Sequence, residues 1–168
     1  MHAGIWEKVK NVKILEWCTE KKKQGFIRHI GFSLHDTFSV FKNILDSYEW
    51  EFCQVQHNYM NENVQVGTKG IEYAYSKNIP VIIMEPLLGG SLVNFPDSIN
   101  KIWKESSRTP IEMTFQWLWD KKEMFMVLIS GMSSMEQLKQ NLALASRSGM
   151  GSLTEGELGI IGKVQNEF

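Results

Sequence analysis

The sequence predicts an α/β protein built on a parallel sheet. Four short apolar runs, rich in β-branched and aromatic residues, alternate with segments whose apolar residues recur at helical spacing. A polar or glycine-containing turn follows each run. Strands that alternate with helices favour a parallel sheet, either doubly wound or part of a barrel, with ligand-binding residues at the carboxyl ends of the strands.

Length and composition are those of one ordinary globular domain, which we expect to cover residues 1–168. The chain is 43% hydrophobic and 22% charged, and its formal net charge is −1. The basic residues are spread along the sequence, so no charge pattern for nucleic acid or an anionic membrane is present. No apolar run approaches the roughly 20 residues that span a bilayer, and no signal pattern begins the chain. We therefore expect a cytoplasmic protein without nucleic-acid or membrane partners.

The two cysteines, Cys18 and Cys53, lie in apolar segments without CxxC or Cys/His ligand spacing. They are predicted to be reduced thiols in the core. No group of residues has the spacing of a metal site, so none is predicted.

The first predicted element is a helix from about Ile5 to Gln24, and Gly25 suits its end. The three lysines Lys21 to Lys23 would occupy its last turn, facing the negative end of the helix dipole. Its apolar face would carry Ile5, Val9, Val12, Leu15 and Cys18.

Four buried strands and the helices between them follow in order. The strands are predicted at Phe26–Phe32, Phe52–Gln56, Val81–Met84 and Phe125–Ile129. Apolar residues at helical spacing mark the helices: Phe38, Phe41 and Leu45; Ile71 and Tyr73 to Tyr75; Met113, Trp117 and Leu118; Met135, Leu138, Leu142 and Ala145.

Helix starts are marked by capping residues. Thr109 and Glu112 bracket Pro110, and the pairs Ser133/Glu136 and Thr154/Glu157 have capping-box spacing. The polar segment from Gly89 to Thr109 is predicted to be a loop with a short helix around Asp97 to Lys104. Trp103, Trp117, Trp119, Phe115 and Phe125 are predicted to pack in the core or an interface.

Four strings follow one another along the chain: GFIRHIGFSLHD, FCQVQHNYMNE, IPVIIMEPLLGGSL and VLISGMSSMEQLKQNLALA. In this order they resemble the second half of the aldo-keto reductases, over nearly the whole chain. The resemblance implies a partial TIM barrel, with four parallel βα units corresponding to strands 5 to 8 and an additional helix at each end. The strings are most similar to a bacterial and archaeal subgroup that often continues into an iron–sulfur tail, and this chain contains no such tail.

The resemblance implies a site for NADP or NAD. Ser33 and Gln54 would bind the nicotinamide carboxamide, which needs both donors and acceptors. Met84 would cover the nicotinamide ring, where better-known members place an aromatic residue. Leu34 stands where many members have asparagine, so the resemblance does not extend to one of the usual amide contacts.

The remaining implied contacts lie on the phosphates and adenosine. Pro86, Leu87, Gly89 and Gly90 match the pyrophosphate loop; Ser130, Gly131, Met132 and Ser133 match the adenosine-side phosphate site; Gln137, Gln140 and Asn141 match the positions around the adenine and its ribose. Gly131 and Gln137 replace basic residues that are common in NADP-preferring members, so the choice between NADP and NAD stays open.

The catalytic aspartate, tyrosine, lysine and histidine of the family all belong to its first four strands. His2 lies near the histidine's place, but its spacing to Trp6 is about three residues short, and no catalytic role is assigned to it. His29 and His57 are predicted to be structural. His35 and Asp36 follow Ser33 at a strand end and could face the presumed site, but the favoured interpretation of Asp36 is a helix N-cap before Thr37. Glu85 could contact a ligand or bond to neighbouring backbone, and both readings stay open.

The sequence thus predicts the cofactor-binding half of an NAD(P)H-dependent oxidoreductase, inactive alone, that would act on a carbonyl substrate only in a complete barrel. Unpaired sheet edges predict self-association or a complementary N-terminal half. The alternatives are a non-catalytic nucleotide-binding or assembly module that pairs with another chain, and an incomplete gene model.

Overall fold

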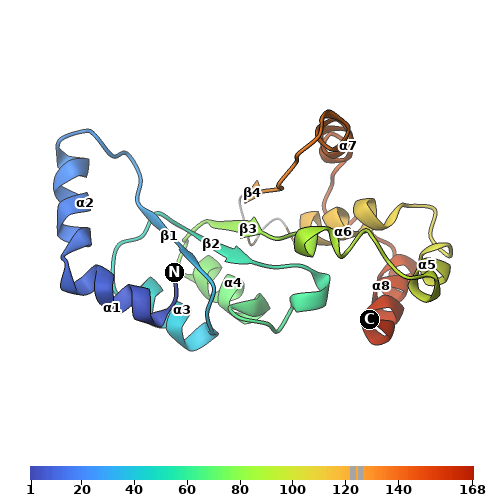
Figure 1. Cartoon of the computed structure of the whole chain (residues 1–168), viewed down its shortest axis with the longest axis horizontal. Helices are drawn as coiled ribbons and strands as arrows, with labels where there is room; N and C mark the ends of the chain where they lie inside the picture. Colours follow the sequence, from blue (N-terminus) through green and yellow to red (C-terminus); the bar gives the residue numbers. More distant parts are fainter. Residues whose placement is uncertain (122–123, 125–126) are drawn as a thin grey trace. The chain divides into compact units, whose positions relative to one another are not determined.

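The computed structural model describes residues 1–121, 124 and 127–168. Within them the chain has an α/β fold with eight α-helices and four parallel strands (Figure 1). The strands are β1 (Gly31–Leu34), β2 (Phe52–Gln56), β3 (Val81–Met84) and β4 (Val127–Leu128), and they form one sheet in the order β1-β2-β3-β4. The predicted α/β class with a parallel sheet is therefore confirmed.

The chain divides into two compact units. Unit 1 comprises residues 1–56 and 63–83 with the described part of 124–127; unit 2 comprises residues 57–62 and 128–168 with the described part of 84–123. Each unit is described by itself below. A single domain over the whole chain stays a prediction.

In unit 1, β1 and β2 pack against α3 (Phe38–Asp46) and α4 (Gly67–Ser76). Leu34 and Val55, from the two strands, and Phe41 and Ile44, from α3, are fully buried. An aromatic cluster completes this core: the Trp50 ring centroid lies 4.8 Å from that of Phe32, 4.9 Å from that of Tyr48 and 6.3 Å from that of Trp6. Strands β2 and β3 have the predicted bounds.

The prediction of one first helix is wrong. The structure has two helices in this segment, α1 (Ala3–Asn11) and α2 (Ile14–Lys23), which run in different directions in Figure 1. Lys13 between them adopts a left-handed conformation (φ 54°) that no helix can continue through. The predicted apolar face is not buried either: Val12 is 67% exposed, and Trp6 is the buried residue of α1. Gly25 (φ 80°) ends α2 as expected.

Strand β1 begins at Gly31, five residues later than predicted. The backbone amides of Phe26 and Ile27 both donate to the Lys21 carbonyl oxygen, so these residues close the end of α2. Phe26 is 77% exposed as a result. The apolar character of Phe26 and Ile27 therefore does not belong to a buried strand.

Unit 2 contains α5 (Asp97–Trp103), α6 (Pro110–Trp119), α7 (Met135–Ala145) and α8 (Glu155–Glu167), with the short 3-10 turns η1 (Tyr59–Asn61) and η2 (Leu88–Gly90). Its core lies around the buried Tyr59 ring, whose centroid is 6.3 Å from that of Trp103 and 6.4 Å from that of Trp117. The predicted caps hold: the hydroxyl of Thr109 accepts from the Glu112 amide, and Thr154 and Glu157 form a capping box.

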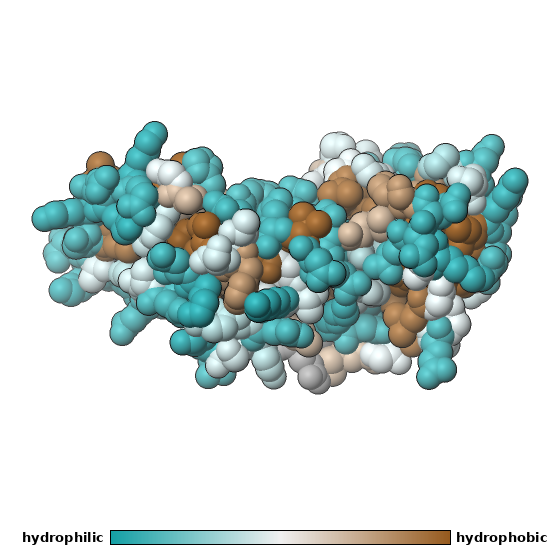
Figure 2. All heavy atoms as spheres, turned by 90° about the horizontal axis from the view of Figure 1, so that it is seen from below, coloured by the Kyte–Doolittle hydropathy of each residue, from teal (hydrophilic) through white to brown (hydrophobic). Residues whose placement is uncertain are grey.

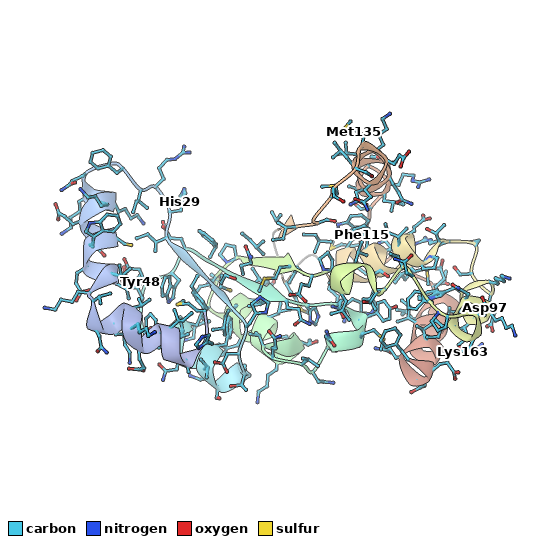
Figure 3. All side chains as sticks on the ribbon, in the orientation of Figure 1. His29, Tyr48, Asp97, Phe115, Met135 and Lys163 are labelled. Carbon is cyan, nitrogen blue, oxygen red and sulfur yellow. The ribbon has the colours of Figure 1, made fainter. Side chains whose placement is uncertain are left out.

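Helix α7 starts one residue later than predicted, because Ser134 caps it and Gln137 completes the capping box. The apolar residues that mark this helix in the sequence are largely exposed: Met135 is 65% and Leu142 61% exposed, and Leu144 is the buried residue of the helix. In Figure 1, α7 stands away from α5 and α8, and Figure 3 places Met135 on this separate helix. No helix of unit 2 covers this face within the described residues.

The strand predicted from Phe125 falls partly outside the described residues, as does Phe125 itself. The described part, β4, contains two residues, and Val127 is 41% exposed rather than buried. β4 is last in the strand order. Figure 2 shows apolar atoms at several other places on one face of the molecule, among hydrophilic ones. None of the described helices combines the length and the apolarity that crossing a membrane requires.

Candidate functional site

A cavity of about 630 Å³ lies within unit 2, after the carboxyl end of β3. Three segments supply its walls: the turn that follows β3, the start of α6, and α7 with the stretch that leads into it. The lining residues are Met84, Glu85, Pro86, Leu87, Gly89, Gly90, Val93, Asn94, Ile111, Ile129, Ser130, Gly131, Met132, Gln137, Gln140 and Asn141.

The structure brings most of the predicted cofactor residues together in this cavity. All of those from Met84 onward line it, except Ser133, which hydrogen-bonds to the lining residue Gln137. Ser33 and Gln54 belong to unit 1, where they are Cα partners in the parallel register of β1 and β2.

The turn after β3 is tight because several of its residues adopt left-handed conformations. Gly89 (φ 64°) and Gly90 (φ 96°) do so without a steric penalty. Glu85 (φ 54°) and Leu88 (φ 47°) also do so, although a side chain makes this conformation costly by about 1 kcal/mol or more. The surrounding hydrogen bonds must therefore hold the turn in place.

Asn58 supplies much of that support. Its side chain is fully buried, and its Nδ2 donates to the Glu85 carbonyl oxygen at 3.0 Å. Its Oδ1 accepts from the amides of Met60 (3.1 Å) and Asn61 (3.0 Å), which caps η1. One amide side chain thus joins η1 to the residue with which the turn begins.

Hydrogen bonds from residues that follow the turn support its other end. Asn94, which lines the cavity, donates from its Nδ2 to the Gly90 carbonyl oxygen at 3.2 Å. The Leu92 amide donates to the Leu87 carbonyl oxygen, and the Leu92 side chain is fully buried. Both ends of the turn are therefore anchored in unit 2.

The opposite wall is organised by the side chain of Gln137. Its Oε1 accepts from the Ser133 amide (2.8 Å), the Ser133 hydroxyl (3.2 Å) and the Ser134 amide (3.3 Å). One turn further along α7, Asn141 donates from its Nδ2 to the Ser130 Oγ at 3.2 Å. The Oδ1 of Asn141 is buried and has no hydrogen-bond partner among the described residues.

The cavity wall carries little charge. Glu85 is the one ionisable residue in its lining, which contains no lysine, arginine or histidine among the described residues. No group of three or more His, Cys, Asp or Glu is placed to hold a metal ion in the part of the chain that the structure describes. The described lining therefore offers a ligand mainly backbone groups and uncharged side chains.

His57, which follows β2, has a structural position. Its side chain is 1% exposed, and its ring centroid lies 5.4 Å from that of Trp117. Burial, reinforced by the Lys121 ammonium, lowers the pKa of His57 from 6.5 to about 4. The imidazole is therefore neutral at physiological pH.

Asp36 is not the predicted N-cap. Thr37 occupies the cap position of α3, and Asp36 instead accepts at its Oδ2 from the Ala3 amide (2.9 Å). That bond and one from the Thr37 amide lower the pKa of the Asp36 carboxyl. Asp36 thus serves the first turn of α1, because negative charge is favourable at a helix N-terminus.

Several residues of the site were not among the predicted site residues. Val93, Asn94, Ile111 and Ile129 line the cavity, and Asn58 supports it from behind. Asn58 could have been found, because asparagine directly after a strand is a common cap for a following turn. Asn94 lies inside a segment predicted only as loop, where no spacing marks it.

A comparison with protein-family models gives one match. The family described as "Aldo/keto reductase family" matches residues 6–149. No curated protein matches the chain significantly.

Solved structures with the same fold are numerous. An aldo-keto reductase from Bacillus halodurans in its holo form is 19% identical, with a TM-score of 0.69 over 87% of this chain and 53% of that one. An aldo-keto reductase from Klebsiella pneumoniae in complex with NADPH is 19% identical, with a TM-score of 0.68 over 90% of this chain and 52% of that one.

A further Klebsiella pneumoniae structure, in complex with NADP and acetate, is 17% identical, with a TM-score of 0.64 over 88% of this chain and 51% of that one. The chain therefore spans about half the length of the solved structures that it matches. At these identities the likeness concerns the fold.

Proposed function

Because the chain belongs to the aldo/keto reductase family, we propose that it forms the cofactor-binding half of an NAD(P)H-dependent oxidoreductase that reduces a carbonyl. In this proposal β1 to β4 correspond to strands 5 to 8 of the family's TIM barrel. The match to about half of each solved relative, two of which hold NADPH or NADP, supports it.

The observation that carries the proposal is the cavity of unit 2. Residues that are far apart in sequence, from Met84 to Gly90 and from Ser130 to Asn141, line one space of about 630 Å³. Such a volume suits part of a dinucleotide. The glycines of the turn let backbone approach a ligand closely.

Each group of residues has a proposed role. Ser33 and Gln54, which face each other in the β1–β2 register, would orient the nicotinamide carboxamide, and Met84 would cover the ring. Pro86, Leu87, Gly89 and Gly90 would lie along the pyrophosphate. Ser130 to Ser133, with Gln137, Gln140 and Asn141, would hold the adenosine end. When bound, the reduced nicotinamide supplies a hydride to a carbonyl carbon.

Binding by the purified chain tests this proposal. Gly131 is the best position to block, because a Cβ there meets no atom within 4 Å and the backbone is unstrained. Gly131→Trp should fill the cavity and abolish nucleotide binding in calorimetry. Gly159→Trp is the matched control: its Cβ is equally free, and it lies on α8 outside the cavity. Equal binding by wild type and Gly131→Trp would refute the site.

We also propose that this chain does not catalyse the reduction when it is alone. None of its residues is assigned the family's catalytic aspartate, tyrosine, lysine or histidine role, so it should bind nucleotide without reducing aldehydes. Incubation of the chain with NADPH or NADH and an aromatic aldehyde, followed at 340 nm, checks this. Turnover that Gly131→Trp abolishes would show that the chain is catalytic by itself.

A second candidate function is that of a non-catalytic assembly module, which the exposed apolar residues of α7 favour. Its exposed Met135 and Leu142 give the helix an apolar face that the described residues of unit 2 leave uncovered. A partner chain, either a second copy or a complementary half-barrel, would bury that face. Failure of a folded sample to bind either nucleotide, together with concentration-dependent association, would favour this candidate.

A further inference from the structure

We propose that one exposed face of α2 pairs with the α2 of a second copy of this chain, antiparallel and about a two-fold axis, through two ion pairs between Glu16 and Lys23. This surface belongs to unit 1 alone. It is distinct from the cavity of unit 2 and from the exposed face of α7. The inference therefore does not depend on the proposed binding of a nucleotide.

Helix α2 has little support within its own unit. It contains ten residues, and none of them is buried. The Thr19 hydroxyl lies 2.7 Å from the Tyr48 hydroxyl, and the Lys22 ammonium lies 2.7 Å from the Glu51 carboxylate. Helices shorter than roughly 12–15 residues are marginal in water unless they pack against another element. A second element packed on α2 would therefore stabilise it.

A groove of about 550 Å³ offers the place for such an element, between α1 and α2, which meet at an angle in Figure 1. The α2 residues in its lining are Leu15, Glu16, Thr19, Glu20 and Lys23. They recur at helical spacing and so form one face of the helix, about two turns long. Half-buried apolar side chains, among them Val9 and Tyr48, complete the groove.

The charges of the groove balance, because its lining contains two acidic and two basic residues. A surface without net charge attracts neither a nucleic acid nor an anionic membrane. Two of the four charged residues have partners in their own chain: Lys10 pairs with Glu7 at 2.7 Å, and Glu20 accepts from the Gln24 amide at 2.9 Å. The other two are left for a partner.

These two are Glu16 and Lys23, which are exposed and form no ion pair with any residue that the structure describes. Glu16 lies near the start of α2 and Lys23 at its end. In an antiparallel pair, each Glu16 faces the Lys23 of the other copy, and the two helix dipoles oppose each other. A parallel pair would bring like charges together. Because a two-fold interface forms each contact twice, the face complements itself.

Charge reversal tests this pairing. Glu16→Lys places two lysines opposite each other at both ends of the interface, and Lys23→Glu does the same with two glutamates. Each variant should dimerise about tenfold or more weakly than its parent. The double variant with both changes re-forms both ion pairs and should recover most of the affinity. Both changes oppose the dipole of α2, so a more stable helix cannot explain the recovery.

A mixture of the two single variants gives the sharper measurement. The Glu16→Lys chain supplies two lysines and the Lys23→Glu chain two glutamates, so the heterodimer contains two attractive pairs while each homodimer contains none. We expect the heterodimer to form about tenfold or more tightly than either homodimer. Glu72→Lys makes the same charge change at an exposed residue of α4, outside the groove, and should leave dimerisation unchanged.

The measurement is sedimentation velocity, after circular dichroism has shown that each chain is folded. Every chain, including the parent, carries Leu142→Glu, so that association through the exposed face of α7 does not contribute. A parent that stays monomeric at about 1 mM would overturn the inference. So would single variants that dimerise as the parent does, or a mixture that associates no more tightly than its components.

Discussion

At the scale of single residues, Asn58 contributes most to the shape of the cavity. Two neighbouring backbone amides and one carbonyl depend on this one side chain, which is buried and forms three hydrogen bonds. The carbonyl belongs to Glu85, which needs support because its φ is positive. Asn58 therefore positions the cavity wall without touching the cavity.

Asn58→Ala should lower the free energy of unfolding by about 2–3 kcal/mol, because it removes the three hydrogen bonds of a fully buried side chain. Urea denaturation measures this. The control is Asn63→Ala, an exposed residue five positions later, which should change stability by less than about 0.5 kcal/mol. Equal effects of the two substitutions would show that the three hydrogen bonds are energetically unimportant.

His57 should make the stability of the protein pH-dependent. In the unfolded chain its imidazole binds a proton below about pH 6.5, whereas burial holds its pKa in the folded chain to about 4. Protons therefore favour the unfolded state, and stability present above pH 6.5 is lost as the pH falls toward 4. The loss amounts to at most about 3 kcal/mol.

Chemical denaturation at pH 7, 5.5 and 4.5 checks this, with His57→Phe as the variant. We expect the variant to lose less stability than wild type over this range. His35→Phe, at an exposed histidine, should keep the wild-type pH dependence. If the His57→Phe and wild-type curves run parallel, another group is responsible for the acid sensitivity.

At the scale of elements, the sequence correctly predicts those features that depend on residues close together in the chain. Strands β2 and β3, the caps at Thr109 and Thr154, and the end of α2 at Gly25 could be read directly, because each depends on nearby residues. The cavity-lining segments after β3 and before α7 were found through the family resemblance rather than from physical patterns.

The predictions from sequence were wrong where distant contacts determine burial, or where a rare backbone conformation determines the end of a helix. The break at Lys13 has no glycine or proline to announce it, and a lysine in the left-handed region cannot be foreseen from spacing. The apolar residues of α7 predict a buried face, yet burial depends on a neighbouring element, and no described part of unit 2 supplies one. Phe26 is apolar and exposed for the same kind of reason, since hydrogen bonds to Lys21 fix its backbone in the end of α2.

The break between α1 and α2 leads to a prediction for Lys13. Lys13→Gly should stabilise the protein by up to about 1 kcal/mol, because glycine adopts a φ of 54° without a Cβ clash. Thermal denaturation would show the gain. The same change at Lys8, inside α1, should instead cost about 1 kcal/mol, and a loss at both positions would mean that the break is not strained.

At the scale of the whole molecule, the chain spans about half the length of the solved structures that it matches. Its sheet has two edge strands, β1 and β4, among the described residues. Together with the exposed apolar residues of α7, these edges favour association with another chain.

We expect the purified chain to self-associate at micromolar concentration in sedimentation velocity experiments. Leu142→Glu should weaken the association, because it places a charge on the apolar face of α7, where Leu142 is 61% exposed. Lys139→Glu changes charge on the same helix at an exposed polar position and should have a smaller effect. A monomeric wild type would exclude α7 as a self-association surface.

Helix α2 is expected to unwind more readily than the rest of unit 1, because little of it is buried. It contains no buried residue, and Figure 3 shows it beside Tyr48, whose hydroxyl hydrogen-bonds to Thr19 of the helix at 2.7 Å. With so little burial to lose, α2 can unwind while the rest of unit 1 stays folded. Its amides should exchange with deuterium far sooner than those of β2, and removal of the Tyr48 hydroxyl should hasten exchange in α2 alone.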